Sequence, residues 1–337
     1  MLHATILSEG LDSHTQHDRR AFGRFYTPKV IAEQLALRTV GALDLRTLSK
    51  NGISCIDPFC GDGRLITALM VAALGREPNL RKWRVTLWDM DAAATQVAGA
   101  NVSAVASRLG LDAEIRSLAV DAFRELDGHV GEFDAVVTNP PWEALNPDRR
   151  ETDHMSAERK QSYVDALRAY DDLLAEVLPL SQPSRKFSGW GTNLSRCGLE
   201  LSMQLCRRGA GVCAIVLPAS ILGDQTTRRL RAALFRQFRV SHVAHFPAEA
   251  RLFTDVDQPF VTLVASEGGP TTSTTLERHG RDGRVCDSSE VEIAPSEMEA
   301  LGFRLPCEIP GDLLSTFVHF GGFASVGSLE CSAHDGL

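Results

Sequence analysis

The most chemically specific stretch of the sequence is Asn139-Pro140-Pro141-Trp142, which follows the apolar run 133–138. The two prolines fix the backbone and lack N–H donors, so the Asn139 side-chain oxygen and the adjacent carbonyl can accept hydrogen bonds from one external group. The Trp142 indole offers a flat face on which a planar ligand can stack. Together these residues are suited to hold an amino group on a flat base, and a purely structural turn is the less favoured interpretation.

Acidic residues end three further apolar runs. Asp57, Asp89 and Asp121 each stand directly after a short run that is typical of a buried strand. Because open α/β sheets bind ligands beyond the carboxyl ends of their strands, we expect the three carboxylates and Asn139 to line one crevice. A carboxylate at Asp89 can accept both hydroxyls of a ribose, whereas Asp91 is suited to cap the next helix. Asp121 could accept a hydrogen bond from an exocyclic adenine amine, or it could face solvent as a loop carboxylate.

The turn at residues 57–63 contains Gly61 and Gly63. Glycines at such a turn let the backbone approach a ligand closely and open the next helix. The turn lacks the spacing of a dinucleotide fingerprint and the Lys-Ser/Thr of a phosphate loop, so a nucleoside triphosphate is disfavoured. Its carboxylates, Asp57 and Asp62, favour a ligand that carries a cation over a pyrophosphate.

Strands and helices that could position these residues alternate along most of the chain. Apolar runs predict strands at 53–56, 85–88, 115–120, 133–138, 211–217, 240–246 and 259–265. Helical patterns lie between most of them, and the first helix is expected to use Thr27 as its N-cap and Pro28 as its first residue. This alternation indicates an α/β fold with a doubly wound, mostly parallel sheet. The last two runs could pair as an antiparallel hairpin at one edge.

The composition excludes several classes of protein. With 44% apolar residues among 337, the chain can build a full core, so wholesale disorder is not expected. No apolar run approaches the ~18 residues needed to cross a bilayer. The N-terminus lacks an apolar stretch of signal-peptide type, so we expect a cytoplasmic protein without membrane association. The eight cysteines form no CxxC pair, which favours buried thiols over disulfides or a zinc site, and no metal is expected.

The charge distribution indicates a candidate surface for nucleic acid. A formal net charge of −8 argues against a protein that coats nucleic acid through charge alone. Between residues 201 and 240, however, seven arginines stand against one acid, and such a segment can contact a phosphate backbone. Arg228, Arg229 and Arg231 are the candidate DNA contacts; a merely solvated helix face is the alternative.

Three motifs carry a resemblance to a known family. Asn139-Pro140-Pro141-Trp142 resembles the catalytic motif of amino-group DNA methyltransferases, which use S-adenosyl-L-methionine. The segment 22–28, Gly-Arg-Phe-Tyr-Thr-Pro after Phe22, resembles the motif that precedes the cofactor turn in one subclass, and 215–218 resembles the family's strand ending in proline. The resemblance covers about residues 22–265 and implies a Rossmann-like fold of the class I methyltransferase type.

The resemblance also implies which residues contact S-adenosyl-L-methionine. These are Tyr26, Thr27, Pro28, Asp57, Cys60, Gly61, Gly63, Asp89 and Asp121. The first three would lie near the methionine part, beside the turn formed by the next four. Asp89 would hold the ribose and Asp121 the adenine amine of the cofactor.

The same resemblance implies how a target base is held. Asn139 and Pro140 would accept the hydrogens of the target amine, with Pro141 completing the motif, and Trp142 would stack on the base. Phe253 falls where such enzymes often place a second aromatic residue, although packing in the core is an equal alternative.

The expected function is therefore site-specific methylation of adenine N6 in double-stranded DNA after base flipping, in a restriction-modification or phage-defence system. Methylation of cytosine N4 and a non-catalytic subunit of a defence complex are the alternatives. A separate specificity or restriction subunit is a candidate partner. The expected division is an N-terminal arm (1–20), a catalytic domain (21–266), and a linker with an incomplete start of a target-recognition domain (267–337), as in a truncated or split enzyme.

Overall fold

The computed structural model describes residues 26–147, 152–183, 186, 190–253 and 257–307. The strands within these residues are β1 (Ile53–Asp57), β2 (Lys82–Asp89), β3 (Asp112–Ala119), β4 (Ala135–Thr138), β5 (Val212–Pro218), β6 (Phe238–Phe246), β7 (Phe260–Glu267), β8 (Ser273–His279) and β9 (Val285–Glu292). The α-helices are α3 (Lys29–Ala42), α4 (Leu45–Asn51), α5 (Arg64–Arg76), α6 (Ala92–Leu109), α7 (Ala122–Glu125), α9 (Ala157–Val177), α10 (Leu194–Leu205), α11 (Arg228–Gln237) and α12 (Pro295–Ala300). Short 3₁₀ turns are η2 (Leu126–Gly128), η3 (Ala219–Leu222) and η4 (Ala248–Ala250).

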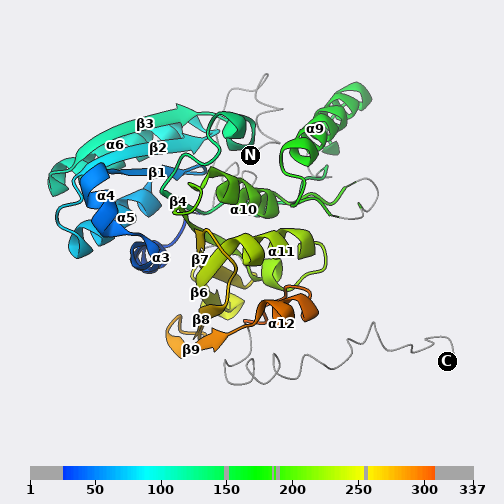
Figure 1. Ribbon diagram of the computed structural model, residues 1–337. Coiled ribbons are helices and arrows are strands. Elements are labelled where there is room, and N and C mark those ends of the chain that lie inside the picture. Colours follow the sequence, from blue (N-terminus) through cyan, green and yellow to red (C-terminus); the bar gives the residue numbers. More distant parts are fainter. Residues whose placement is uncertain (1–25, 148–151, 184–185, 187–189, 254–256, 308–337) are drawn as a thin grey trace.

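The strands form one sheet in the order β3-β2-β1-β4-β5-β7-β6-β8-β9 (Figure 1). The first five strands of this order, β3, β2, β1, β4 and β5, are parallel to one another. Cys55 of β1 lies opposite Val85 of β2 and Ala135 of β4. Strand β7 is antiparallel to both β5 and β6, which confirms the predicted pairing of the last two apolar runs. The expected α/β fold with a mostly parallel sheet is therefore confirmed.

Each face of the sheet has its own apolar core, because side chains alternate along a strand. On β1, Cys55 packs in the core shared with α3, α5 and α6, while Ile56 packs in the core shared with α9, α10 and α11. Every residue of β1, β4 and β5 is buried, as is usual for central strands covered on both faces. The sheet is thus doubly wound, with the carboxyl ends of β1, β2, β3 and β4 together at one edge.

Two of the strands lie in the segment that was expected to be a linker. Strand β8 pairs in parallel with β6, and β9 pairs antiparallel with β8. After α12, the Leu305 amide donates to the Leu222 carbonyl (3.0 Å). Residues 273–292 therefore extend the sheet through β8 and β9, which differs from the expected linker. The segment after them contacts α11 through Glu299 and Phe303.

The first described helix begins one residue later than predicted. Pro28, not Thr27, is the N-cap of α3, and Thr27 is buried with its carbonyl accepting from Arg64 Nη1 (2.6 Å). Among the helices in the described part of the chain, none combines the length and apolar character needed to span a membrane.

Candidate functional site

A cavity lies at the carboxyl ends of β1 to β4, where the sequence predicts a crevice. Its walls include Pro58, Phe59, Asp89, Met90, Val120, Asp121, Ala122, Phe123, Pro141, Tyr170 and Leu194. The Phe59 and Phe123 rings stand 5.4 Å apart, centroid to centroid. The cavity therefore combines apolar and aromatic walls with two carboxylates, and the Asn-Pro-Pro-Trp motif (139–142) borders it through Pro141.

The turn 57–63 is shaped by its two glycines. Gly61 and Gly63 both have positive φ (52° and 78°), a region that residues with a Cβ rarely adopt. A Cβ on Gly63 would lie 3.1 Å from the Ala98 backbone, and one on Gly61 would lie 3.2 Å from the Tyr26 ring. Glycine at these positions thus allows α5 to pack on α6 and brings the N-terminal motif beside the turn.

Asp57 is enclosed behind this turn and does not line the cavity. Its Oδ1 accepts from the Thr138 hydroxyl (2.7 Å) and the Phe59 amide (3.2 Å). Burial raises the pKa of Asp57 to about 7, against the opposing effect of these two hydrogen bonds. Asp57 therefore connects β1 to the residue immediately before the catalytic motif.

Asp89 faces the cavity and also holds the turn in place. Its two oxygens accept from the backbone amides of Gly61 (3.0 Å) and Asp91 (2.9 Å). Asp91 caps α6 by accepting from the Ala93 amide (3.0 Å), as predicted. The structure thus brings Asp89 and Gly61 together at the point expected for a ribose.

Asp121 is largely enclosed, unlike a loop carboxylate in solvent. Its Oδ1 accepts from the Phe123 amide (3.0 Å) and from the Tyr170 hydroxyl (3.0 Å), and its Oδ2 pairs with Arg124 Nε (3.3 Å). Burial raises the pKa of Asp121, while its partners lower it. Tyr170 comes from α9, an element that no sequence pattern associates with this site.

Helix α10 packs against the Asn-Pro-Pro-Trp motif. Pro140 is buried, and a Cβ on Gly198 would lie 2.3 Å from Pro140 Cβ, so only glycine allows this approach. The Trp142 ring lies 5.3 Å from the Phe253 ring and 6.2 Å from the Phe260 ring. Phe253 is buried (4% exposed), as in the core-packing alternative, yet it contacts the residue expected to stack on the base.

The remaining cofactor candidates surround the turn. Tyr26 is half exposed, with Arg64 Cζ 5.4 Å from the centre of its ring. Cys60 is buried, its amide donates to the Trp88 carbonyl (2.8 Å), and burial raises the pKa of its thiol. Cys60 is therefore a protonated packing residue of the turn.

The three candidate DNA contacts on α11 differ in their exposure to solvent. Arg228 and Arg229 are exposed, but Arg231 is only 1% exposed. Its Nε donates to the Phe303 carbonyl and its Nη1 to the Ile221 carbonyl, both at 2.9 Å. The prediction for Arg231 is wrong, because its buried guanidinium joins α11 to the preceding turn η3 and to the segment that follows α12.

Three positions next to the site were not predicted: Thr138, Tyr170 and Gly198. A glycine within a helical pattern is a signal for close packing, so Gly198 could have been found. Tyr170 lies on the buried stripe of α9, where its 3–4 residue spacing indicates only a core position.

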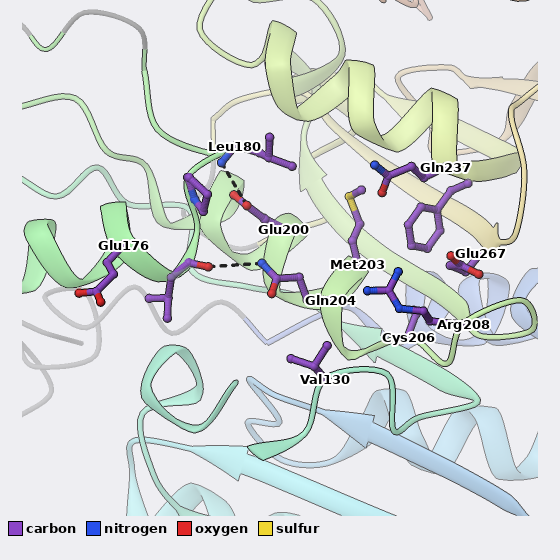
Figure 2. A pocket seen from close by; sticks show the side chains of 13 residues that line it. Val130, Glu176, Leu180, Glu200, Met203, Gln204, Cys206, Arg208, Gln237 and Glu267 are labelled. Carbon is purple, nitrogen blue, oxygen red and sulfur yellow. Dashed lines mark hydrogen bonds between the residues drawn. The ribbon is translucent and has the colours of Figure 1, made fainter. Parts of the chain in front are cut away.

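A second cavity lies beside the amino ends of β4 and β5, away from the Asn-Pro-Pro-Trp motif. Figure 2 shows Glu200 and Gln204 of α10 pointing toward the end of α9. Glu200 accepts from the Leu180 and Ser181 amides (3.1 and 2.6 Å), and Gln204 donates to the Val177 carbonyl (3.3 Å). These polar groups hold the end of α9 against α10. No group of three or more His, Cys, Asp or Glu side chains within the described ranges could bind a metal ion.

Comparison with known proteins identifies the fold. No protein-family model and no curated protein sequence matches the chain. Among solved structures, a modification subunit ascribed to a type I restriction enzyme of Vibrio vulnificus YJ016 matches over 94% of this chain and 60% of its own, with 14% identity and a TM-score of 0.51. A type I restriction-modification system matches over 89% and 64%, with 15% identity and a TM-score of 0.54. A DrdV–DNA complex matches over 78% and 28%, with 15% identity and a TM-score of 0.53.

These similarities show a shared architecture at low identity. The chain shares with these structures a doubly wound α/β fold around a mostly parallel sheet, which agrees with the fold that the sequence resemblance implies. It spans less than two thirds of the length of the first two matching chains.

Proposed function

We propose that this chain is a DNA methyltransferase of a restriction-modification or phage-defence system, and that it transfers a methyl group from S-adenosyl-L-methionine to adenine N6. The observation that carries the proposal is the position of Asn139-Pro140-Pro141-Trp142 at the border of a carboxylate-containing cavity, at the carboxyl ends of β1 to β4.

The cavity suits the proposed cofactor. Aromatic walls from Phe59 and Phe123 fit a flat base, and the Asp89 and Asp121 carboxylates can accept from hydroxyl and amine groups. Its acidic character also suits a cation better than a phosphate. S-adenosyl-L-methionine supplies an activated methyl group together with its leaving group, so the chain has only to position the acceptor.

The catalytic motif would position that acceptor. An adenine amine is a poor nucleophile because its lone pair is delocalised into the ring. Acceptance of its hydrogens by the Asn139 side chain and the Pro140 carbonyl favours a more tetrahedral nitrogen, whose lone pair is then available for attack. Orientation and placement of charge supply most of the rate enhancement in such a site.

The target base would have to leave the DNA duplex, which costs a few kcal/mol. Stacking on Trp142 can return about 1–3 kcal/mol of this cost. Exposed Arg228 and Arg229 on α11 are the proposed phosphate contacts. The matching structures include a DNA complex and a multi-subunit restriction-modification system, which supports duplex DNA and a specificity or restriction subunit as partners.

The test is transfer of radiolabelled methyl groups to DNA by the wild type and by Asn139→Ala, with single-molecule sequencing of DNA from cells that express each. We expect adenine marks with the wild type and none with Asn139→Ala, while both bind the cofactor. Marks at cytosine N4 would overturn the choice of base. Cofactor binding without transfer by the wild type, with and without candidate partner subunits, would favour a non-catalytic subunit.

A further inference from the structure

Helix α9 contributes two adjacent buried residues to the surroundings of the cavity. The Tyr170 hydroxyl donates to Asp121 Oδ1 (3.0 Å), and Asp171 accepts from the Thr192 hydroxyl (2.5 Å) and pairs with Lys186. Through Thr192, whose carbonyl accepts from the Leu145 amide (2.8 Å), the same helix turn reaches the segment that follows the catalytic motif. The contacts of Asp171 therefore fix the helix turn that carries Tyr170, and Tyr170 itself lines the cavity.

The hydrogen bonds and the ion pair of Asp121 occupy most of the lone-pair sites of its carboxylate. A carboxylate offers about four lone-pair sites, two on each oxygen. Oδ1 uses both of its sites on the Phe123 amide and the Tyr170 hydroxyl, and Oδ2 uses one on Arg124. One site on Oδ2 remains in this arrangement, beside the aromatic walls that suit a base.

The Tyr170 hydroxyl also influences the charge of this carboxylate. Burial raises the pKa of Asp121, and the hydrogen bond from Tyr170 is the largest of the contributions that lower it. Burial and the neighbouring Asp121 raise the pKa of Tyr170, so the phenol keeps its proton and can act only as the donor to this carboxylate.

We propose that Tyr170 is a positioning residue that makes the cavity selective for a base with an exocyclic amine. By occupying Oδ1, the phenol fixes the rotation of the Asp121 carboxylate and leaves Oδ2 to accept from the amine. A base that carries a carbonyl at this point would instead face the carboxylate with a second acceptor, which is repulsive. This inference rests on the proposed function, since it assigns the cavity to the adenine of the cofactor.

The test compares Tyr170→Phe with the wild type in titration calorimetry, using S-adenosylhomocysteine and its deaminated analogue, S-inosylhomocysteine. We expect Tyr170→Phe to weaken binding of the adenosyl compound about tenfold, because a hydrogen bond that orients a charged group is lost. Binding of the inosyl compound should change less than twofold. The adenosyl affinity of the variant should also begin to fall at a higher pH than that of the wild type as the solution is acidified, because Asp121 protonates more easily without the phenol.

Tyr163→Phe is the matched control, since Tyr163 is buried on the same helix and is not among the residues that line the cavity. It should leave the ratio of the two affinities unchanged, and urea unfolding should show that both variants are folded. Equal weakening of both compounds by Tyr170→Phe, or no weakening of either, would overturn the inference and assign Tyr170 to packing alone. If the wild type itself binds neither compound, the proposed function fails together with the inference.

Discussion

Gly198 offers a direct test of how α10 positions the proposed catalytic motif, residues 139–142. In Gly198→Ala, the new Cβ would lie 2.3 Å from Pro140 Cβ, 2.8 Å from Pro140 Cγ and 3.5 Å from Phe59 Cε2. Carbon atoms in contact are normally about 3.5–4.0 Å apart, so α10 and Pro140 must separate by about 1 Å. The proline ring is rigid, and the motion therefore passes to the backbone of Asn139.

We expect Gly198→Ala to lower the turnover of methyl transfer much more than it lowers the free energy of unfolding. A displacement of about 1 Å at a reacting group can lower turnover by about 100-fold. Overpacking of a core by one methyl group costs about 1–3 kcal/mol, which a folded domain can tolerate. The cavity proposed to bind the cofactor borders Pro141 but is built mainly from other strand ends, so binding of S-adenosylhomocysteine should change little.

The assay is methyl transfer to DNA under saturating cofactor, with calorimetry of cofactor binding and urea unfolding on the same preparations. Gly75→Ala is the matched control, because Gly75 lies in the exposed surface of α5 with no atom within 4 Å of the added Cβ. That control should keep full activity and gain up to about 1 kcal/mol of stability. Wild-type turnover in Gly198→Ala would refute the argument that contact with α10 positions the motif.

Three further predictions concern other parts of the site. Burial raises the Asp57 pKa to about 7, so the folded state keeps a proton that the unfolded chain releases above about pH 4. Wild-type stability should therefore fall as the pH rises from 4 to 7, by up to about 3 kcal/mol between pH 5 and pH 8. In urea unfolding at these two pH values, Asp57→Asn should abolish this fall, and parallel pH profiles of the two proteins would contradict the prediction. The double variant Arg228→Ala/Arg229→Ala should lower the slope of log affinity for DNA against log salt by about 2, whereas Arg231→Met should leave that slope unchanged and lower stability by about 1–3 kcal/mol. Trp142→Ala should weaken binding of DNA that carries the target base by about 10- to 100-fold, because stacking worth about 1–3 kcal/mol is lost, and an unchanged affinity would exclude Trp142 from stacking.

The parallel half of the fold could be predicted because its signals are local. Buried central strands are continuous apolar runs, and each is followed by a polar residue where the chain leaves the sheet. Even for two carboxylates in one turn, the sequence was enough to assign Asp89 to the cavity and Asp91 to the helix cap.

The strands after residue 266 and the burial of Arg231 depend on contacts that sequence patterns do not encode. Strand β8 buries Glu277, which pairs with Arg38 of α3, and β9 is an edge strand whose exposed face is polar. Such strands resemble a linker in composition because their polar groups find partners only in the folded state. Arg231 was misassigned for the same reason: its charge indicates the surface, although its helix face, shared with Leu230 and Leu234, indicates the core.

The strands beyond residue 266 have a practical consequence for dividing the chain into fragments. Removal of β8 would expose the backbone of β6 along an apolar strand, and an edge of this kind is a template for pairing between molecules. Loss of residues 301–307 would also leave the Arg231 guanidinium without the Phe303 carbonyl in a buried site. A fragment that ends at residue 266 should therefore aggregate. Complementation by two fragments should succeed only when the cut falls in an exposed connection, such as the one between β8 and β9.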